Sequence, residues 1–377
     1  MKHLCTAMAF LIGSVAIAQQ GFQEQIDELK TKSDKFNVYL NFQSSFDATT
    51  AKDADTHFNF MARQLRLEFR GNINERIFYR LRHRLNRSNG GASLDNLARA
   101  TDMMYAGFRL NEKWTLTAGK MCQAWGGFEF DLNPMNIYEY SDFVEHMDNF
   151  MVGGMLTYAP NENHELNFQI TNSRTNKFDD LYPENKDIKA TTAPLAYIFN
   201  WNGSMWDGLI KTRWGVGYEQ EAKNHSGTMV MLGTMLNLPK FQMFFDYMMA
   251  NQGLDRFGYA SIYPEALGIE HKGALKGITY NSFVTKAEYQ PHEHWNIFGK
   301  FMYETARVGK SDLPANFKDG ERNSFGYFVG VEYLPFKDQD LRFFATYVGR
   351  KYTYVTDALN THTNRFSIGM MYRIKAF

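Results

Sequence analysis

The chain has 377 residues, equal numbers of acidic and basic side chains, and 16% aromatic residues. Its net charge of zero does not indicate binding to nucleic acid. Cys122 is the single cysteine outside the N-terminal region, so an exported chain that has lost this region cannot form an intramolecular disulfide. Many aromatic residues with a negative mean hydropathy are typical of a transmembrane barrel, although an aromatic-rich soluble sandwich is the alternative.

The N-terminus has the pattern of a secretory signal peptide. Lys2 supplies the positive region, Leu4–Val15 is mostly apolar, and Ala16-Ile17-Ala18 forms a small-x-small cleavage site before Gln19. A membrane anchor is the alternative, but a spanning helix needs about twenty apolar residues and this run is shorter. We therefore expect residues 1–18 to be removed during export.

Residues 19–35 are expected to form a short periplasmic segment ahead of a barrel that covers residues 36–377. Within this segment Phe22, Ile26 and Leu29 lie at helical spacing, so that a short helix and a flexible linker are both possible.

Alternation with period two indicates β-strands along the rest of the chain. In Phe36–Phe42 every second residue is apolar, and Leu166–Thr171 places Leu, Phe and Ile against Asn and Gln. Phe325–Tyr333 repeats the pattern, whereas Met229–Leu236 is apolar on both faces and is the weakest strand prediction. In a membrane barrel the apolar faces point to lipid and the polar faces to the lumen.

The connections between these strands are alternately short and long. The short ones are rich in turn residues and cover residues 71–75, 111–113, 160–164, 202–207, 239–240, 291–294 and 335–340. The long ones cover residues 47–56, 88–97, 122–149, 174–191, 221–226, 251–277, 307–322 and 353–363. Seven short turns and eight longer links predict an all-β fold, an antiparallel barrel of sixteen strands with short periplasmic turns.

The same alternation predicts a basic lumen wall. If the leucines at 65, 67, 81 and 85 face lipid, then Arg66, Glu68 and Arg70 on one strand face inward. The inward residues on the next strand are Arg80, Arg82 and Arg84. The opposite assignment would cost about 2 to 4 kcal/mol for each basic side chain at the bilayer midplane. Further inward bases by parity are Lys211, Arg213, Lys286, Lys300, Arg342, Arg350, Arg365 and Arg373.

The arginines have two interpretations. They form a ladder that attracts anions, or they pair with lumenal carboxylates and only stabilise the wall. Arg63 has the parity of Leu65, so that a bulge near Ala62 or a position beyond the membrane edge is needed to explain it.

The third long link, residues 122–149, is acidic and aromatic and contains no lysine or arginine. We expect it to fold into the lumen as a constriction, where its carboxylates would create a transverse field with the basic wall. A loop on the outer rim and a calcium site are the alternatives. Its acidic residues are Glu129, Asp131, Glu139, Asp142, Glu145 and Asp148.

Three stretches carry a resemblance to a known family. Residues 64–71 (QLRLEFRG) with the arginine-rich strand to Leu85, residues 116–120 (LTAGK) and residues 125–129 (WGGFE) resemble the phosphate-selective porin O and P family of Bacteroidota type. The resemblance implies a trimeric porin of sixteen strands with an inward third loop. The pore-lining residues that it implies are Arg66, Arg70, Arg80, Arg82, Arg84 and Lys120.

We therefore expect an outer-membrane porin for passive diffusion of small hydrophilic solutes, with a mild preference for anions, of which phosphate is a candidate. The acidic third loop favours modest selectivity over a dedicated phosphate site. No cofactor, metal or nucleic acid is expected. The expected partners are the lipid bilayer, the solutes and the outer-membrane insertion machinery. The terminal residue Phe377 is out of phase with the outward face of the last strand. Alternatives are an adhesive or structural barrel and a phospholipase-type enzyme, but the strands next to His83 contain no serine.

Overall fold

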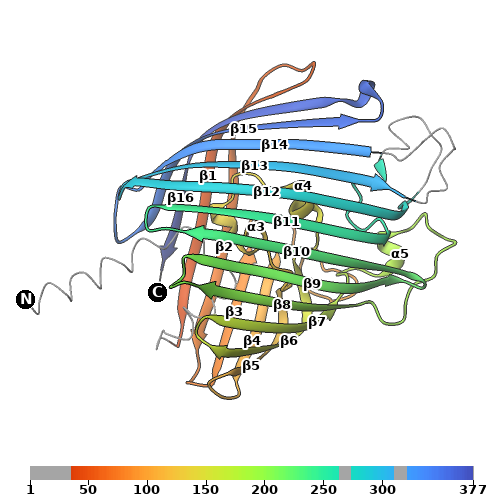
Figure 1. The fold of residues 1–377 in the computed structure, drawn as a ribbon, viewed down its shortest axis with the longest axis horizontal. Helices are drawn as coiled ribbons and strands as arrows, with labels where there is room; N and C mark the ends of the chain where they lie inside the picture. The colour runs from red at the N-terminus through yellow and green to blue at the C-terminus, as the bar shows by residue number, and fades with distance from the viewer. Residues whose placement is uncertain (1–34, 263–272, 310–320, 377) are drawn as a thin grey trace, which may run out of the picture.

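A computed structural model describes residues 35–262, 273–309 and 321–376. In these ranges sixteen antiparallel strands close into one barrel, in which β16 pairs with β1 (Figure 1). The first eight are β1 (Asn37–Ala51), β2 (His57–Asn72), β3 (Ile77–Arg84), β4 (Thr101–Arg109), β5 (Trp114–Cys122), β6 (Phe150–Asn161), β7 (His164–Asn172) and β8 (Leu195–Met205). The others are β9 (Ile210–Ala222), β10 (His225–Asn237), β11 (Phe241–Leu254), β12 (Lys276–His292), β13 (Trp295–Val308), β14 (Glu321–Tyr333), β15 (Asp340–Tyr354) and β16 (Thr361–Lys375).

The strand alternation predicted from the sequence is confirmed by burial. On β7, Phe168 and Ile170 are exposed on the outer surface, while Asn167 and Gln169 are buried inside. On β16, the aromatic and aliphatic positions 366 and 368 are exposed in the same way. A closed ring of strands satisfies the backbone hydrogen bonds of every member, which leaves apolar side chains free to face lipid.

The alternation of short and long links is confirmed in part: the links at 85–100, 123–149, 173–194 and 255–275 are long, but those at 52–56 and 355–360 have only five and six residues, against six in the short turn at 334–339. Residues 221–226 were expected to form a longer link, but β9 and β10 are joined by Lys223 and Asn224 alone. Asn224 has a φ of 64°, a left-handed conformation that asparagine tolerates well in tight turns. The long-link prediction was therefore wrong here, because the flanking polar residues continue the two strands.

Arg63 sits in a bulge, as its awkward parity required. Gln64 lies opposite Gln43 and Ala62 lies opposite Ser44, which leaves Arg63 as the extra residue of β2. The bulge turns its side chain inward, where Nε donates to Ser45 Oγ at 2.9 Å and the guanidinium pairs with Asp47.

The predicted signal peptide, the segment 19–35 except its last residue, and the phase of Phe377 lie outside the described residues. The described helices are short: α3 (Phe128–Asp131), η1 (Pro134–Asn136), α4 (Asp142–His146), α5 (Phe178–Leu181) and η2 (Asp357–Leu359). Among them, none has the length and hydrophobicity of a membrane-spanning segment.

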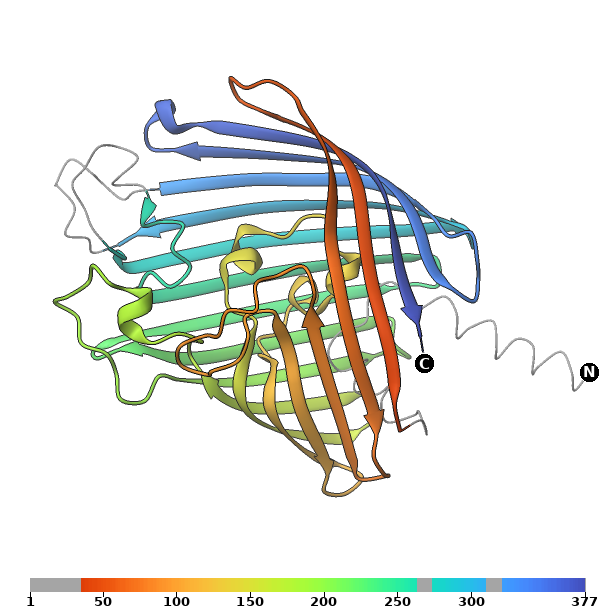
Figure 2. The same cartoon turned by 180° about the vertical axis from the view of Figure 1, so that it is seen from behind.

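The link between β5 and β6 folds into the barrel, as predicted. We call this segment, residues 123–149, the inner loop; it contains α3, η1 and α4. Figure 2 shows its short helices surrounded by the strands, and its contacts run to β9, β10, β11 and the strands that follow. The inner loop therefore fills one side of the lumen and leaves the side of β2 to β5 open.

Candidate functional site

Two wall carboxylates hold the backbone of the inner loop. Asp246 on β11 accepts hydrogen bonds from the N–H groups of Phe128 and Glu129, at 2.9 and 2.7 Å. Glu304 on β13 accepts from the N–H groups of Asp142 and Phe143, at 2.8 and 2.9 Å. Each carboxylate thereby satisfies the free N–H groups at the start of a short helix. The inward acidic residues of these strands thus position the inner loop.

Five of the six inner-loop carboxylates form ion pairs with basic residues of the barrel or of another loop. Glu129 pairs with Lys300 on β13, and Asp142 pairs with Arg350 on β15 and, at 2.6 Å, with Arg322 on β14. The other pairs are Asp131 with Arg213 at 3.4 Å, Glu139 with Arg365 at 2.9 Å, and Asp148 with Arg256. These acidic residues therefore attach the loop to the wall behind it.

Apolar contacts complete this attachment. Trp125, Phe128 and Phe143 belong to one buried cluster with inward-facing methionines of β10, β11 and β13. Tyr138 stacks on Phe298 at 4.8 Å between ring centroids, in a second cluster. The general expectation that inward faces are polar is wrong on this side of the barrel, because these faces meet the loop and not water. The two apolar faces of Met229–Leu236 were the sequence signal for it.

Glycines make room for the start of the inner loop. A Cβ on Gly215 would lie 1.9 Å from the Trp125 carbonyl oxygen, and one on Gly217 would lie 2.4 Å from the Trp125 ring. Both glycines lie on β9, so Trp125 packs directly against the backbone of this strand.

We expect Gly215→Ala to displace the inner loop and to destabilise it by about 1 to 3 kcal/mol, the usual cost of overpacking. The measurement is single-channel conductance in a planar bilayer, which should become larger or more variable. Gly154→Ala is the matched control, because its Cβ would have its nearest contact at 3.7 Å. Wild-type conductance in Gly215→Ala would show that Trp125 does not fix the loop.

The arginines of β2 and β3 fall into two groups around different carboxylates. Arg66, Arg82 and Arg84 surround Asp102 of β4, with nitrogen–oxygen distances of 3.6, 3.1 and 2.7 Å. Nearer the short-turn end of the barrel, Arg80 and Arg70 lie 3.1 and 3.7 Å from Glu68. The arginines thus pair with lumenal carboxylates, as the second interpretation expected, and in both groups the cations outnumber the carboxylates.

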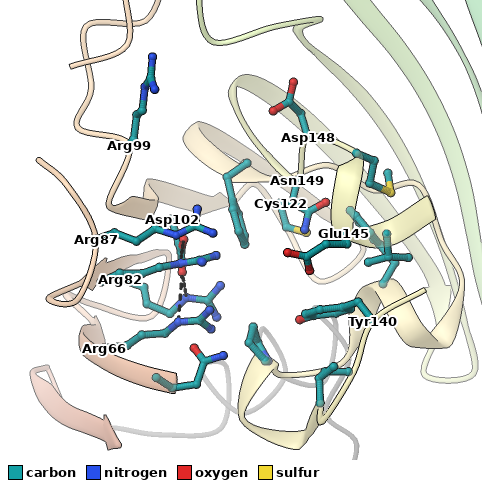
Figure 3. Close-up of a pocket in the computed structure, with 18 of the residues that line it drawn as sticks. Arg66, Arg82, Arg87, Arg99, Asp102, Cys122, Tyr140, Glu145, Asp148 and Asn149 are labelled. Atoms are coloured by element: carbon teal, nitrogen blue, oxygen red, sulfur yellow. Dashed lines mark hydrogen bonds and ion pairs between the residues drawn. The ribbon is translucent and has the colours of Figure 1, made fainter. Parts of the chain in front are cut away.

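A cavity of about 1060 Å³ separates the inner loop from the wall of β2 to β5. Its charges are segregated, as Figure 3 shows for labelled residues of each side. The basic lining residues are Arg63, Arg66, Arg82, Arg84, Arg87, Arg99 and Lys120, all on the wall side or in the link before β4. Except for Asp102, the acidic lining residues lie in the inner loop: Asp131, Glu139, Asp142, Glu145 and Asp148. This segregation matches the transverse field that the sequence suggested.

Among the ten predicted pore-lining bases, Arg66, Arg82, Arg84 and Lys120 line this cavity. Lys120 turns inward next to Gly119, whose φ is 127°, and lies 3.2 Å from Asp95. Arg70 and Arg80 lie deeper, at Glu68, and Arg342 contacts Asp340 at 2.9 Å. The three others are outside the cavity lining: Lys211 on β9, and Arg213 and Arg350 in contact with the inner loop.

Glu145 differs from the other inner-loop carboxylates. It is exposed, forms no ion pair in the described ranges, and points into the cavity toward the arginine side (Figure 3). Arg87 and Arg99 are likewise exposed cavity residues without an ion pair in the part of the chain that the structure describes. The sequence alone did not identify these two arginines or Asp102 as cavity residues. Asp102 is near the start of its strand, where the boundary of the strand could not be assigned from the sequence.

Ionisation in the inner loop follows these contacts. Although the side chain of Glu145 is exposed to the cavity, it lies inside the barrel, and this partial desolvation raises its pKa; the nearby Glu139 raises it further, against the opposing effect of His146 and Arg87. Burial acts in the same direction on Asp142, but Arg350 and Arg322 outweigh it and lower its pKa. Burial raises the pKa of Tyr140 to about 12. Glu145 is therefore protonated at a higher pH than an ordinary glutamate, whereas Asp142 stays ionised to a lower pH than an ordinary aspartate.

The calcium alternative finds no support in residues 35–262, 273–309 and 321–376. Within them, no three side chains of His, Cys, Asp or Glu are grouped to hold a metal ion.

Comparison with protein families gives one match over nearly the whole described chain. The family model described as phosphate-selective porin O and P matches residues 36–374. A search of curated proteins found no match.

Solved outer-membrane proteins share the fold at low sequence identity. The outer membrane channel DcaP of Acinetobacter baumannii has a TM-score of 0.62 and 12% identity, over 90% of this chain and 97% of that one. The anion-selective porin from Comamonas acidovorans has a TM-score of 0.56 and 9% identity, over 90% and 99%. OmpT of Vibrio cholerae, expressed in the outer membrane, has a TM-score of 0.55 and 11% identity, over 91% and 99%.

Proposed function

Because this chain belongs to the phosphate-selective porin O and P family, it is an outer-membrane porin for passive diffusion, and we propose that it prefers small hydrophilic anions. The preference is mild and arises in the cavity between the inner loop and the wall of β2 to β5.

One observation carries the preference: three arginines share the single carboxylate of Asp102 at the cavity surface. Arg87 and Arg99 add two exposed cations, and Glu145 adds one negative charge. A positive excess in a narrow passage with low-dielectric walls raises the local concentration of anions. The inner loop contributes no lysine or arginine, so we propose attraction without a tight phosphate site.

Reconstitution of the mature chain in a planar bilayer under a KCl gradient tests this function. We expect stable channels and a reversal potential on the anion-selective side. A cation-selective reversal potential would contradict the preference, and an absence of conductance would favour the adhesive or structural alternative.

Acidification is expected to strengthen the anion preference. The pKa of Glu145 is raised, so this carboxyl takes up its proton at a higher pH than an ordinary glutamate. Protonation removes a negative charge from the cavity, and the neighbouring groups Glu139, His146 and Arg87 remain in place. The measurement is the reversal potential between about pH 7 and about pH 5.

Glu145→Gln is the control for this pH dependence. It should give a stronger anion preference at neutral pH and a smaller change on acidification, because the carboxyl that acidification would neutralise is absent. An unaltered pH profile in this variant would mean that Glu145 does not act on the permeating ions.

We propose no enzymatic activity for this channel. His83 Nδ1 lies 3.0 Å from the Thr101 hydroxyl on the wall, but within the described residues its ring contacts no carboxylate that would orient it as a base. Phospholipid turnover by the purified protein in detergent would contradict this.

Three further parts of the proposal concern assembly. We propose cleavage after Ala18, insertion by the outer-membrane machinery, and association as a homotrimer, as expected from the family resemblance. Sequencing the N-terminus of the mature protein tests the first, depletion of the insertion machinery tests the second, and its mass in mild detergent tests the third.

A further inference from the structure

The wall side of the cavity holds three arginines that share one carboxylate. Arg66 is 2% exposed, and neither its Nε nor its Nη1 has a hydrogen-bond partner in the described part of the chain. Its ion-pair partner among the described residues is Asp102, at 3.6 Å, which Arg82 and Arg84 also use. One carboxylate cannot neutralise three guanidinium groups, so the cluster keeps an excess of positive charge at the cavity, where Arg84 is its most exposed member and a solute carboxylate is attracted.

The opposite side of the cavity holds a carboxylate that lacks a cation. Glu145 extends from α4 into the cavity, and Figure 3 shows it across from Arg66, Arg82 and Arg87. The other five carboxylates of the inner loop are occupied by bases that hold the loop, as described above. Glu145 is therefore the inner-loop group available to a cationic group in the cavity.

Resting on the proposed function, we propose that this cavity favours solutes that carry an anionic and a cationic group together, namely amino acids and short peptides. The carboxylate of the solute lies at Arg66, Arg82 and Arg84, and its ammonium group lies at Glu145. A simple anion is attracted to the arginines but repelled by Glu145. A simple cation is attracted to Glu145 but repelled by the arginines. Only a zwitterion satisfies both sides of the transverse field.

The size of the cavity agrees with this class of solute. Drug-sized ligands occupy pockets of about 300 to 1,000 Å³, and this cavity of about 1060 Å³ holds a short peptide with its hydration water. The polar lining from Gln64, Asn86 and Tyr140 offers hydrogen bonds to a peptide backbone between the charged ends.

The test compares tracer fluxes of glycylglycine and N-acetylglycine through the full mature chain in liposomes at neutral pH and low salt, where charge interactions are least screened. Both solutes carry a carboxylate and are similar in size, but only glycylglycine has an ammonium group. We expect a flux ratio above one for wild type. In Glu145→Gln the ratio should fall about fivefold, which corresponds to about 1 kcal/mol, while the KCl conductance is retained and the anion preference becomes stronger, as expected above.

Glu162→Gln, at the exposed turn between β6 and β7, is the matched control and should retain the wild-type ratio. Glu145→Asp keeps the charge and should retain most of it. If Glu145→Gln forms no channels, acidification of wild type gives the same test, because protonation of Glu145 should lower the ratio.

Each outcome bears on the proposal. A wild-type ratio of one, or an unchanged ratio in conducting Glu145→Gln channels, overturns zwitterion selection and leaves the anion-preferring porin intact. An absence of wild-type conductance overturns the porin function itself. A fall in ratio that is confined to Glu145→Gln and to acidic wild type supports the proposal.

Discussion

Replacing Arg66, Arg82 and Arg84 together with glutamine is expected to change the channel from anion-preferring to cation-preferring. The replacement removes three positive charges from the cavity wall and leaves the carboxylate of Asp102 without its cations. Two unit charges about 4 Å apart interact with about 4 kcal/mol at an effective dielectric constant of about 20. The reversal potential under a KCl gradient should therefore change sign.

Arg76→Gln provides the control for this triple variant, because Arg76 is exposed in the short turn between β2 and β3 and outside the cavity lining. It should leave the reversal potential unchanged. Asp102→Asn should act in the opposite direction and strengthen the anion preference. If the triple variant keeps the wild-type reversal potential, the arginines serve only to neutralise Asp102.

Lys300→Met is expected to release the inner loop and give a larger, noisier conductance. Lys300 pairs with Glu129 and donates to the carbonyl oxygen of Glu139 at 2.8 Å, and neither charged side chain is more than 2% exposed. Removing one partner of a buried ion pair costs about 3 to 5 kcal/mol, because the other charge remains buried and uncompensated. The sixteen paired strands do not depend on this contact, so the barrel should still form.

Lys337→Met is the matched control for Lys300→Met. Lys337 also pairs with a glutamate, Glu293, at 2.6 Å, but it is 59% exposed at a turn, where an ion pair contributes at most about 1 kcal/mol. Single-channel recordings of the two variants should therefore differ clearly. Wild-type conductance and noise in Lys300→Met would show that the remaining contacts, including Asp246 and Glu304, hold the loop without this ion pair.

The sequence was most informative where a repeating pattern met a fixed geometric rule. Side chains alternate strictly across a strand, and a charge facing lipid is expensive, so the inward position of Arg66 and Arg82 could be read from their neighbours alone. Strict alternation would have placed the charged side chain of Arg63 toward lipid, which indicated an irregularity in the strand. The structure has a bulge at this position. The sequence was less informative at turns. The composition around Lys223 and Asn224 suggested a longer loop, but these two residues form the tight turn of a hairpin.

Strand alternation could not predict which charged residues pair with each other and which remain without an ion pair. Asp102 approaches Arg66 because β3 pairs with both β2 and β4, and that register depends on the whole sheet. Glu145 looks like any other acidic residue of the inner loop until the docking of that loop assigns bases to the other five. The apolar inward methionines of β10 likewise make sense only once the loop covers them.

The sequence by itself determined that this chain forms a barrel with a basic inner wall and an acidic loop inside it, because period-two alternation and link lengths are local properties. The tertiary structure alone decided which charges neutralise each other and which face the cavity. Ion pairing depends on contacts between strands and loops that are far apart in the chain, and a difference of a few ångströms separates a group that holds the loop from one that meets a solute.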